Sequence, residues 1–177
     1  MSSWVALLRA VNLGSRNRVP MPELRARLEA AGHRSVRTYI ASGNVLLETR
    51  TRSRDAVARE LERLVAEAFG VETTAIVRTP DELAALVAAH PFGRDTSRTH
   101  VSFLATRPVA DAVARLTAAD RGPDRVELAG SDVYLHYPNG VQGSRLSAAK
   151  LEQLLGVRGT VRNWRTVEKL AELCSTT

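Results

Sequence analysis

The residues best suited to binding chemistry stand close together in the stretch RAVNLGSRNRVPM, between positions 9 and 21. They are Asn12, Gly14, Arg16, Asn17 and Arg18. Guanidinium groups form paired hydrogen bonds to phosphate or carboxylate, and asparagine and glycine accept turn geometry. The stretch leads into a predicted helix, whose free N–H groups and dipole attract anions. The pattern predicts one wall of an anion site, with an Asn-Gly turn that carries solvated arginines as the alternative.

A second polar segment, TYIASGN at positions 38–44, adds Tyr39, Ser42 and Asn44 to this candidate site. Its Ser-Gly-Asn sequence is also typical of a plain hairpin turn. Two further arginines, Arg9 and Arg37, stand beside the two segments and could contact the same anion. The asparagines would then supply directional hydrogen bonds.

A third polar segment, YPNGVQGSRLS at positions 137–147, carries two glycines, Ser144 and Arg145 before a helix that Ser147 can cap. Backbone N–H groups in such a segment can form an anion cradle. The segment lacks the Gly-Lys-Ser/Thr ending of a phosphate-binding P-loop. A flexible surface loop is the competing interpretation.

Catalytic motifs are missing from the sequence. The histidines at positions 33, 90, 100 and 136 have no metal-ligand spacing, and no two carboxylates are spaced for acid–base chemistry. The serines lack the context of a nucleophile elbow, and Cys174 lies on the apolar face of a predicted helix. We expect no metal and no cofactor, and whether the protein is an enzyme stays open.

Alternating apolar runs and amphipathic segments predict the elements that must position these residues. Strands are expected at 4–9, 35–41, 44–49, 71–78, 100–105, 125–129, 133–137 and 157–162. Helices are expected at 22–31, after Ser53, from Thr79 to about His90, at 109–118, at 147–155, and after Asn163.

The same order of elements occurs twice, which predicts an α+β fold of two tandem ferredoxin-like (βαββαβ) halves, each followed by an extra helix. The halves would span residues 1–90 and 98–177; a looser α+β sheet is the alternative. Only three residues, 106–108, connect the first strand to the first helix in the second half, whereas the first half uses 11–20. Connections longer than a scaffold needs are common sites of function.

Charge and cysteine content limit the class of protein. The net charge is +6, and residues 1–78 hold 13 basic and 8 acidic side chains, whereas residues 79–177 hold 12 and 11. Such a skew suits a polyanion partner, although an arginine-rich coding bias would produce the same composition. One cysteine and no long apolar run predict a cytoplasmic protein without a membrane partner.

Several motifs together resemble one bacterial family. The opening VALLRAVNLGSRNRVPMPEL with TYIASGN, the YPNGVQGSRLS segment and the tail TVRNWRTVEKLAEL are similar to the domain of unknown function 1697 family. In this chain Ala10, Ser15 and Arg145 replace the family's usual Gly, Gly and Lys. The resemblance implies a compact bacterial α+β protein and brings no activity with it. It adds Arg162, Asn163 and Trp164 of the tail to the motif positions.

Three functions remain possible. The first is a binding module for an anionic ligand, with nucleic acid or a nucleotide as the expected partner of the N-terminal half. The second is an enzyme acting on a phosphorylated or carboxylated metabolite through Tyr39, Ser42 and Arg162; the third is an interaction protein in which the same polar residues only hold the fold. The oligomeric state is not predictable. The ligand-binding candidates are Arg9, Asn12, Gly14, Arg16, Asn17, Arg18, Arg37, Tyr39, Ser42, Asn44, Ser144, Arg145, Arg162 and Asn163.

Overall fold

The structure is a computed structural model, and residues 1–176 are described. Within these residues the chain forms two four-stranded antiparallel sheets and six helices, an α+β architecture. The contacts divide it into two units. Unit 1 comprises Met1–Leu83 and the C-terminal residues from Glu172 onward, and unit 2 comprises Ala84–Ala171.

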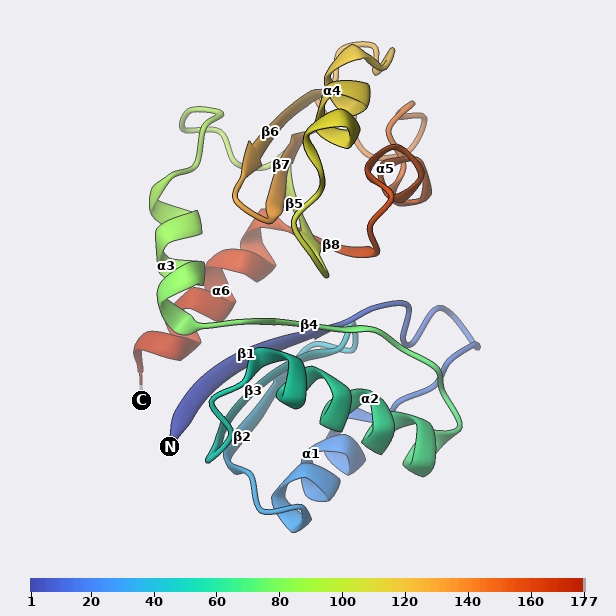
Figure 1. Cartoon of the computed structure of the whole chain (residues 1–177). Coiled ribbons are helices and arrows are strands. Elements are labelled where there is room, and N and C mark those ends of the chain that lie inside the picture. Colours follow the sequence, from blue (N-terminus) through green and yellow to red (C-terminus); the bar gives the residue numbers. More distant parts are fainter. Residues whose placement is uncertain (177) are drawn as a thin grey trace. The chain divides into compact units, whose positions relative to one another are not determined.

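Unit 1 contains one sheet and the helices that follow its strands. Its elements are β1 (Ser2–Leu8), α1 (Met21–Ala30), β2 (Arg34–Tyr39), β3 (Asn44–Thr49), α2 (Arg54–Phe69) and β4 (Ala75–Arg78). The strands are hydrogen-bonded in the order β2-β3-β1-β4. Helices α1 and α2 lie on the same face of this sheet (Figure 1).

The core of unit 1 follows from two periodicities. Alternate residues of β1 point to the same face of the sheet, and Trp4, Ala6 and Leu8 are buried there. Helix α2 presents a stripe at helical spacing that includes Leu61 and Val65. Its first turn is capped by the Ser53 hydroxyl, which accepts a hydrogen bond from the Ala56 N–H.

Unit 2 repeats this strand order in a second sheet. Its elements are β5 (Thr99–Leu104), α4 (Ala110–Ala118), β6 (Arg125–Ala129), β7 (Asp132–His136), α5 (Ala148–Leu155) and β8 (Gly159–Asn163), and its sheet has the order β6-β7-β5-β8. Leu116, Leu135 and Leu151 are buried together between this sheet and helices α4 and α5. The chain passes from unit 1 to unit 2 within helix α3 (Pro80–Ala88) and returns to unit 1 within helix α6 (Trp164–Ser175).

All elements expected from the sequence are present, with shifts at their ends. The largest shift is in β4, which begins at Ala75 rather than at residue 71. Its neighbour β1 ends opposite this point, in the pair Leu8 and Ala75. Residues 71–74 have no strand beside them with which to continue the ladder, although Val71 is buried.

Candidate functional site

The long connection between β1 and α1 is a small hairpin of its own. Leu13 and Arg16 exchange backbone hydrogen bonds of 3.1 and 3.0 Å, and the Asn12 N–H donates to the Asn17 carbonyl at 2.8 Å. We call residues 12–17 the Leu13–Arg16 hairpin. Val11 and Val19 on either side of it are buried in the core of unit 1. The connection is therefore anchored at both ends, and its tip is exposed.

The two asparagines of the hairpin hold its shape. The Asn12 amide donates to the carbonyls of Val19 (2.9 Å) and Ala41 (2.7 Å), and its oxygen accepts from the Val19 N–H (2.8 Å). The Asn17 amide donates to the Ala10 carbonyl at 2.8 Å. Both asparagines have left-handed backbone angles, with φ of 52°. These amides, predicted as ligand-binding groups, are hydrogen-bonded within the protein.

The TYIASGN segment also has a structural role. Gly43 has φ of +85°, and a Cβ atom at this position would lie 2.6 Å from Val11 Cγ2 and 2.9 Å from Leu8 Cβ. The Asn44 side chain is fully buried and donates to the Tyr39 carbonyl (2.9 Å) and to Ser42 Oγ (3.0 Å). The turn between β2 and β3 is thus packed directly against the connection after β1.

A groove of about 600 Å³ lies beside the hairpin. We call it the loop groove, and the residues that line it include Asn12, Gly14, Arg18, Met21, Ile40 and Ala41. Helix α1 begins here at Met21, and no side chain caps its N-terminus. The positive end of the helix dipole therefore faces a groove that also contains a guanidinium.

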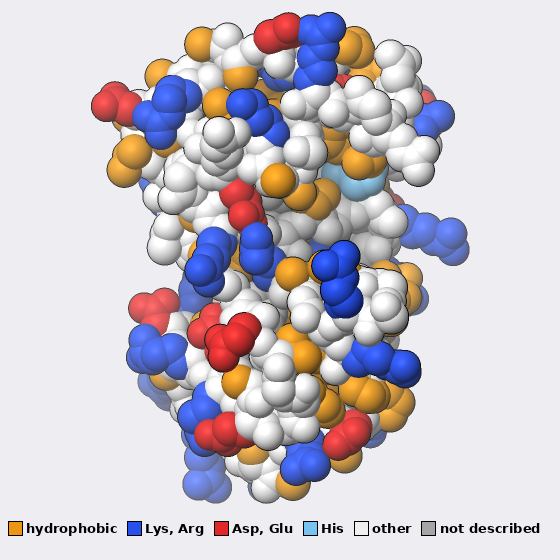
Figure 2. Space-filling view, turned by 90° about the vertical axis from the view of Figure 1, so that its right-hand side faces the viewer, with side chains coloured by type: hydrophobic (Ala, Val, Ile, Leu, Met, Phe, Trp, Pro, Cys, Tyr) orange, Lys and Arg blue, Asp and Glu red, His pale blue; other side chains and the backbone are white. Residues whose placement is uncertain are grey.

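Ile40 borders the loop groove in a strained conformation. Its φ is +50°, which is unusual for a β-branched side chain, and 50% of it is exposed. Leu13, at the hairpin tip, is 55% exposed. Figure 2 shows the side of the molecule on which the β1–α1 connection of Figure 1 lies, where basic and hydrophobic side chains are interspersed. Strain of this kind tends to persist at binding sites.

Arg9 and Arg37 lie outside the loop groove. The backbone of Arg9 is hydrogen-bonded to that of Thr74. The Arg37 guanidinium donates at 2.7 Å to the carbonyl of Leu173, in the last turn of α6. That hydrogen bond satisfies a carbonyl at a helix end, as basic side chains often do.

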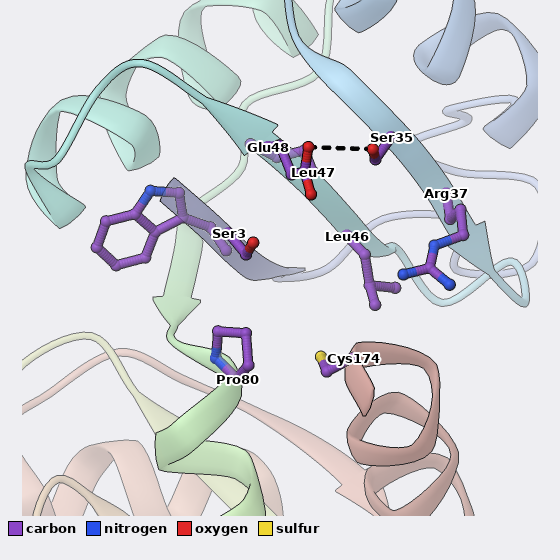
Figure 3. Close-up of a pocket in the computed structure, with 9 residues that line it drawn as sticks. Ser3, Ser35, Arg37, Leu46, Leu47, Glu48, Pro80 and Cys174 are labelled. Atoms are coloured by element: carbon purple, nitrogen blue, oxygen red, sulfur yellow. Dashed lines mark hydrogen bonds between the residues drawn. The ribbon is translucent and has the colours of Figure 1, made fainter. Parts of the chain in front are cut away.

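Arg37 also lines a cavity of about 30 Å³, beside Cys174 (Figure 3). Such a cavity holds about one water molecule. Burial raises the pKa of the Cys174 thiol, against the opposing charge of Arg37. The shift favours the protonated thiol over the thiolate, which is the reactive form.

The candidates of the YPNGVQGSRLS segment lie in unit 2, at a cavity of about 100 Å³. Ser144 Oγ donates to the buried carboxylate of Asp124 and accepts from the Leu146 N–H at 2.9 Å. Arg145 forms an exposed ion pair with Asp120. Ser144 and Arg145 therefore already face carboxylates, and Arg121, the other basic side chain of the lining, donates to the Thr117 carbonyl at 2.8 Å.

Arg162 and Asn163, from the C-terminal motif, also have partners inside unit 2. Arg162 is buried, donates to Thr160 Oγ1 at 2.6 Å, and has its pKa lowered to about 10 by burial. The Asn163 side chain accepts from the Thr166 N–H at 2.9 Å and caps α6.

Sequence reasoning did not find one pair of titratable groups that the fold brings together. His33 Nε2 lies 3.2 Å from Glu60 Oε1, although the two residues are far apart along the chain. They meet because α2 packs beside the turn that leads into β2, and no local spacing signals this contact. Among the described residues, no group of three His, Cys, Asp or Glu side chains is placed to hold a metal ion. None of the described helices has the length and apolarity needed to cross a membrane.

Comparison with known proteins decides the family. A family model described as "Protein of unknown function (DUF1697)" matches residues 1–134. The chain belongs to the DUF1697 family. The resemblance expected from the sequence is thereby confirmed for the part that contains both N-terminal motifs. The DUF1697 match ends before the YPNGVQGSRLS segment and the C-terminal motif.

A solved structure shares the fold of this DUF1697 chain. It is titled the structure of conserved bacterial protein SP0830 from Streptococcus pneumoniae, and the TM-score is 0.75 at 21% sequence identity. The alignment covers 98% of each chain. A search of curated proteins found no match. The comparisons therefore establish the family and the fold, and the family description assigns no function.

Proposed function

We propose that this protein binds a phosphate-bearing ligand of nucleotide size in the loop groove. The observation that carries the proposal is the convergence of Arg18 and the uncapped N-terminus of α1 on one groove. Helix N-termini bind phosphate through their free N–H groups and dipole. In the first turn of α1 the N–H groups of Met21 and Glu23 would do this, because Pro22 has none. A volume of about 600 Å³ is typical of small-molecule sites.

The rigidity of the hairpin supports this proposal. The Asn12 side chain donates two hydrogen bonds and accepts one, and the Asn17 side chain donates one; together they fix the segment that carries the arginines. A site that is already ordered loses little conformational entropy on binding, which favours affinity. The asparagines would thus serve binding by holding the site rather than by touching the ligand.

The charges of the hairpin support it as well. Arg16 and Arg18 are exposed, and neither forms an ion pair or a side-chain hydrogen bond with another described residue. Their guanidinium groups are therefore available to an incoming anion. The ligand could be a free nucleotide or one phosphate of a nucleic-acid strand, because both present the same group.

An interaction protein is the second candidate, favoured by the exposed Leu13 and Ile40. Ile40, which lines the groove, is 50% exposed, and Leu13, at the tip of the hairpin between the lining residues Asn12 and Gly14, is 55% exposed. Exposed apolar groups beside arginines are common in protein interfaces. Under this alternative an acidic protein segment would occupy the loop groove, and nucleotides would not bind.

We also propose that the two units derive from ferredoxin-like (βαββαβ) halves spanning residues 1–90 and 98–177. Both sheets place their second, third, first and fourth strands in that order, which supports the proposal. The first half then differs from the second by its hairpin after β1. The cytoplasmic location stays a prediction from cysteine usage.

A thermal-shift screen and fluorescence anisotropy would test the binding function. We expect nucleotides or sugar phosphates to raise the melting temperature, since ligand at 100 times its Kd adds about 2.7 kcal/mol. Short labelled RNA and DNA, at low and physiological salt, distinguish a strand from a free nucleotide. Arg16→Ala/Arg18→Ala should lose binding, and Arg59→Ala/Arg63→Ala, an equal charge change on α2, should retain it. Absence of binding to all of these probes would contradict the proposal.

A further inference from the structure

A third cavity of unit 1, of about 640 Å³, lies at the other end of the sheet from the loop groove. It is found where β2 begins and β3 ends, whereas the loop groove lies where β1 and β2 end. We call it the His33 cavity. Its polar lining includes Glu29, His33, Arg34, Thr49, Arg50 and Glu60.

His33 and Glu60 form an incompletely bonded pair in the wall of this cavity. The histidine is 6% exposed, and neither ring nitrogen has a hydrogen bond within the described residues. Nε2 lies 3.2 Å from Glu60 Oε1 without the alignment of a hydrogen bond. Glu60 itself accepts no hydrogen bond from any described residue. The Glu60 side chain is 31% exposed, so its carboxylate is open to a donor that enters the cavity.

Arg34 and Arg50 supply positive charge to the same cavity. Both are exposed, and neither guanidinium has a hydrogen-bond or ion-pair partner in the described part of the chain. Glu29, the other acidic side chain of the lining, is occupied by an ion pair with Arg25 at 2.9 Å. The cavity thus offers two free cations and one carboxylate without a donor.

The backbone at the cavity edge is irregular beside Arg34. The pairing of β2 with β3 shifts register between Arg34 and Arg37. Ser35, within this bulge, has φ of +49°. Bulges redirect side chains and are frequent beside functional sites. The start of β2 therefore departs from regular geometry at the position that places Arg34 in the cavity lining.

We propose that the His33 cavity binds a small zwitterion that carries a phosphate or carboxylate group together with an ammonium group. The anionic group would be held by Arg34 and Arg50 through charged hydrogen bonds. The ammonium would donate to Glu60, whose carboxylate is backed by the His33 ring. This site is separate from the loop groove and does not depend on the function proposed for it.

Calorimetric titration with O-phosphoethanolamine and with ethyl phosphate tests the proposal, since ethyl phosphate lacks the ammonium. We expect O-phosphoethanolamine to bind more tightly. Glu60→Gln should weaken O-phosphoethanolamine by about tenfold and should not weaken ethyl phosphate, which loses only a repulsive charge. Arg34→Ala/Arg50→Ala should weaken both ligands, whereas Arg16→Ala/Arg18→Ala should weaken neither.

These outcomes separate the His33 cavity from the loop groove. The substituted side chains are exposed or half-buried, so the variants should keep the far-ultraviolet circular dichroism of the parent protein. Equal binding of the two ligands, or O-phosphoethanolamine binding that survives Glu60→Gln, would overturn the proposal. So would the absence of binding to the parent protein. A loss caused by Arg16→Ala/Arg18→Ala instead would place the ligand in the loop groove.

Discussion

Replacing Gly43 with alanine tests how closely the β2–β3 turn packs against the β1–α1 connection. The new methyl group would meet Val11 Cγ2 at 2.6 Å and Leu8 Cβ at 2.9 Å, both within the core of unit 1. Overpacking of this kind costs about 1–3 kcal/mol. The left-handed angle, φ of +85°, costs about 1–2 kcal/mol more for a residue with a Cβ. We therefore expect Gly43→Ala to lower the free energy of unfolding by about 2–5 kcal/mol.

Gly14→Ala is the matched control for this prediction. Gly14 has a similar left-handed angle, φ of +59°, but a Cβ atom there would meet nothing within 4 Å. Gly14→Ala should lower the free energy of unfolding only by the cost of the left-handed backbone angle, about 1–2 kcal/mol. The difference between the two variants isolates the steric contact with Val11 and Leu8.

Urea unfolding followed by tryptophan fluorescence measures the difference. Trp4 is buried in unit 1 and Trp164 belongs to unit 2, so a Trp164→Phe background makes the signal specific for unit 1. With a slope of about 2 kcal/mol per M, an extra 2 kcal/mol lowers the midpoint by about 1 M. If Gly43→Ala is no more destabilising than Gly14→Ala, the described packing of the turn is wrong.

Three further predictions concern polar groups. Asn12→Ala removes three side-chain hydrogen bonds and should lower the free energy of unfolding by about 2–4 kcal/mol, measured in urea; a loss below about 1 kcal/mol would show that its amide is free. Asn163→Ala should cost about 1 kcal/mol and Asn163→Asp much less, because both Asn and Asp cap a helix; equal losses in thermal unfolding would contradict the cap. Burial, and to a smaller extent the charge of Asp124, raises the pKa of Tyr137 to about 12. The neutral Tyr137 therefore contributes its full stabilisation of the folded state below pH 10, and this stabilisation is lost as the pH rises toward 12. Unfolding in urea at these pH values should show a fall of about 2–3 kcal/mol that Tyr137→Phe removes, and an equal fall in that variant would exclude Tyr137 as the cause.

The regular elements were predictable because their signals are local. The spacing of Val57, Leu61 and Val65 fixes the buried face of α2, and Ser53 marks its start. The Ser-Gly-Asn sequence marks the turn before β3 in the same way. None of these inferences needs knowledge of residues distant in the chain.

The roles of the polar side chains were harder to predict because they depend on contacts between distant residues. Asn12 has the composition of a ligand-binding residue, yet its amide reaches the carbonyl of Ala41, which only the folded sheet brings near. Arg162 is a surface residue by type and is buried in β8. The pair of His33 and Glu60 is likewise set by how α2 packs, not by spacing.

The part of the candidate site that the sequence did indicate is the excess length of the β1–α1 connection. Comparison with the short connection 106–108 in the second half singles out residues 11–20 without any knowledge of the fold. The structure shows that this length forms the Leu13–Arg16 hairpin, with Arg18 in the lining of the loop groove. What the sequence could not indicate is that the asparagines hold the hairpin while the arginines stay exposed.

Nuclear magnetic resonance titration of the ¹⁵N-labelled protein with ATP most directly tests whether the loop groove binds a phosphate-bearing ligand. We expect saturable shifts of the backbone amides of residues 13–18, of Glu23 at the start of α1, and of Ala41 across the groove. Arg16→Ala/Arg18→Ala should abolish them, while Arg59→Ala/Arg63→Ala should not. Amides in these segments that stay unmoved at saturating ATP, or shifts confined to other parts of the chain, would contradict the assignment of the groove.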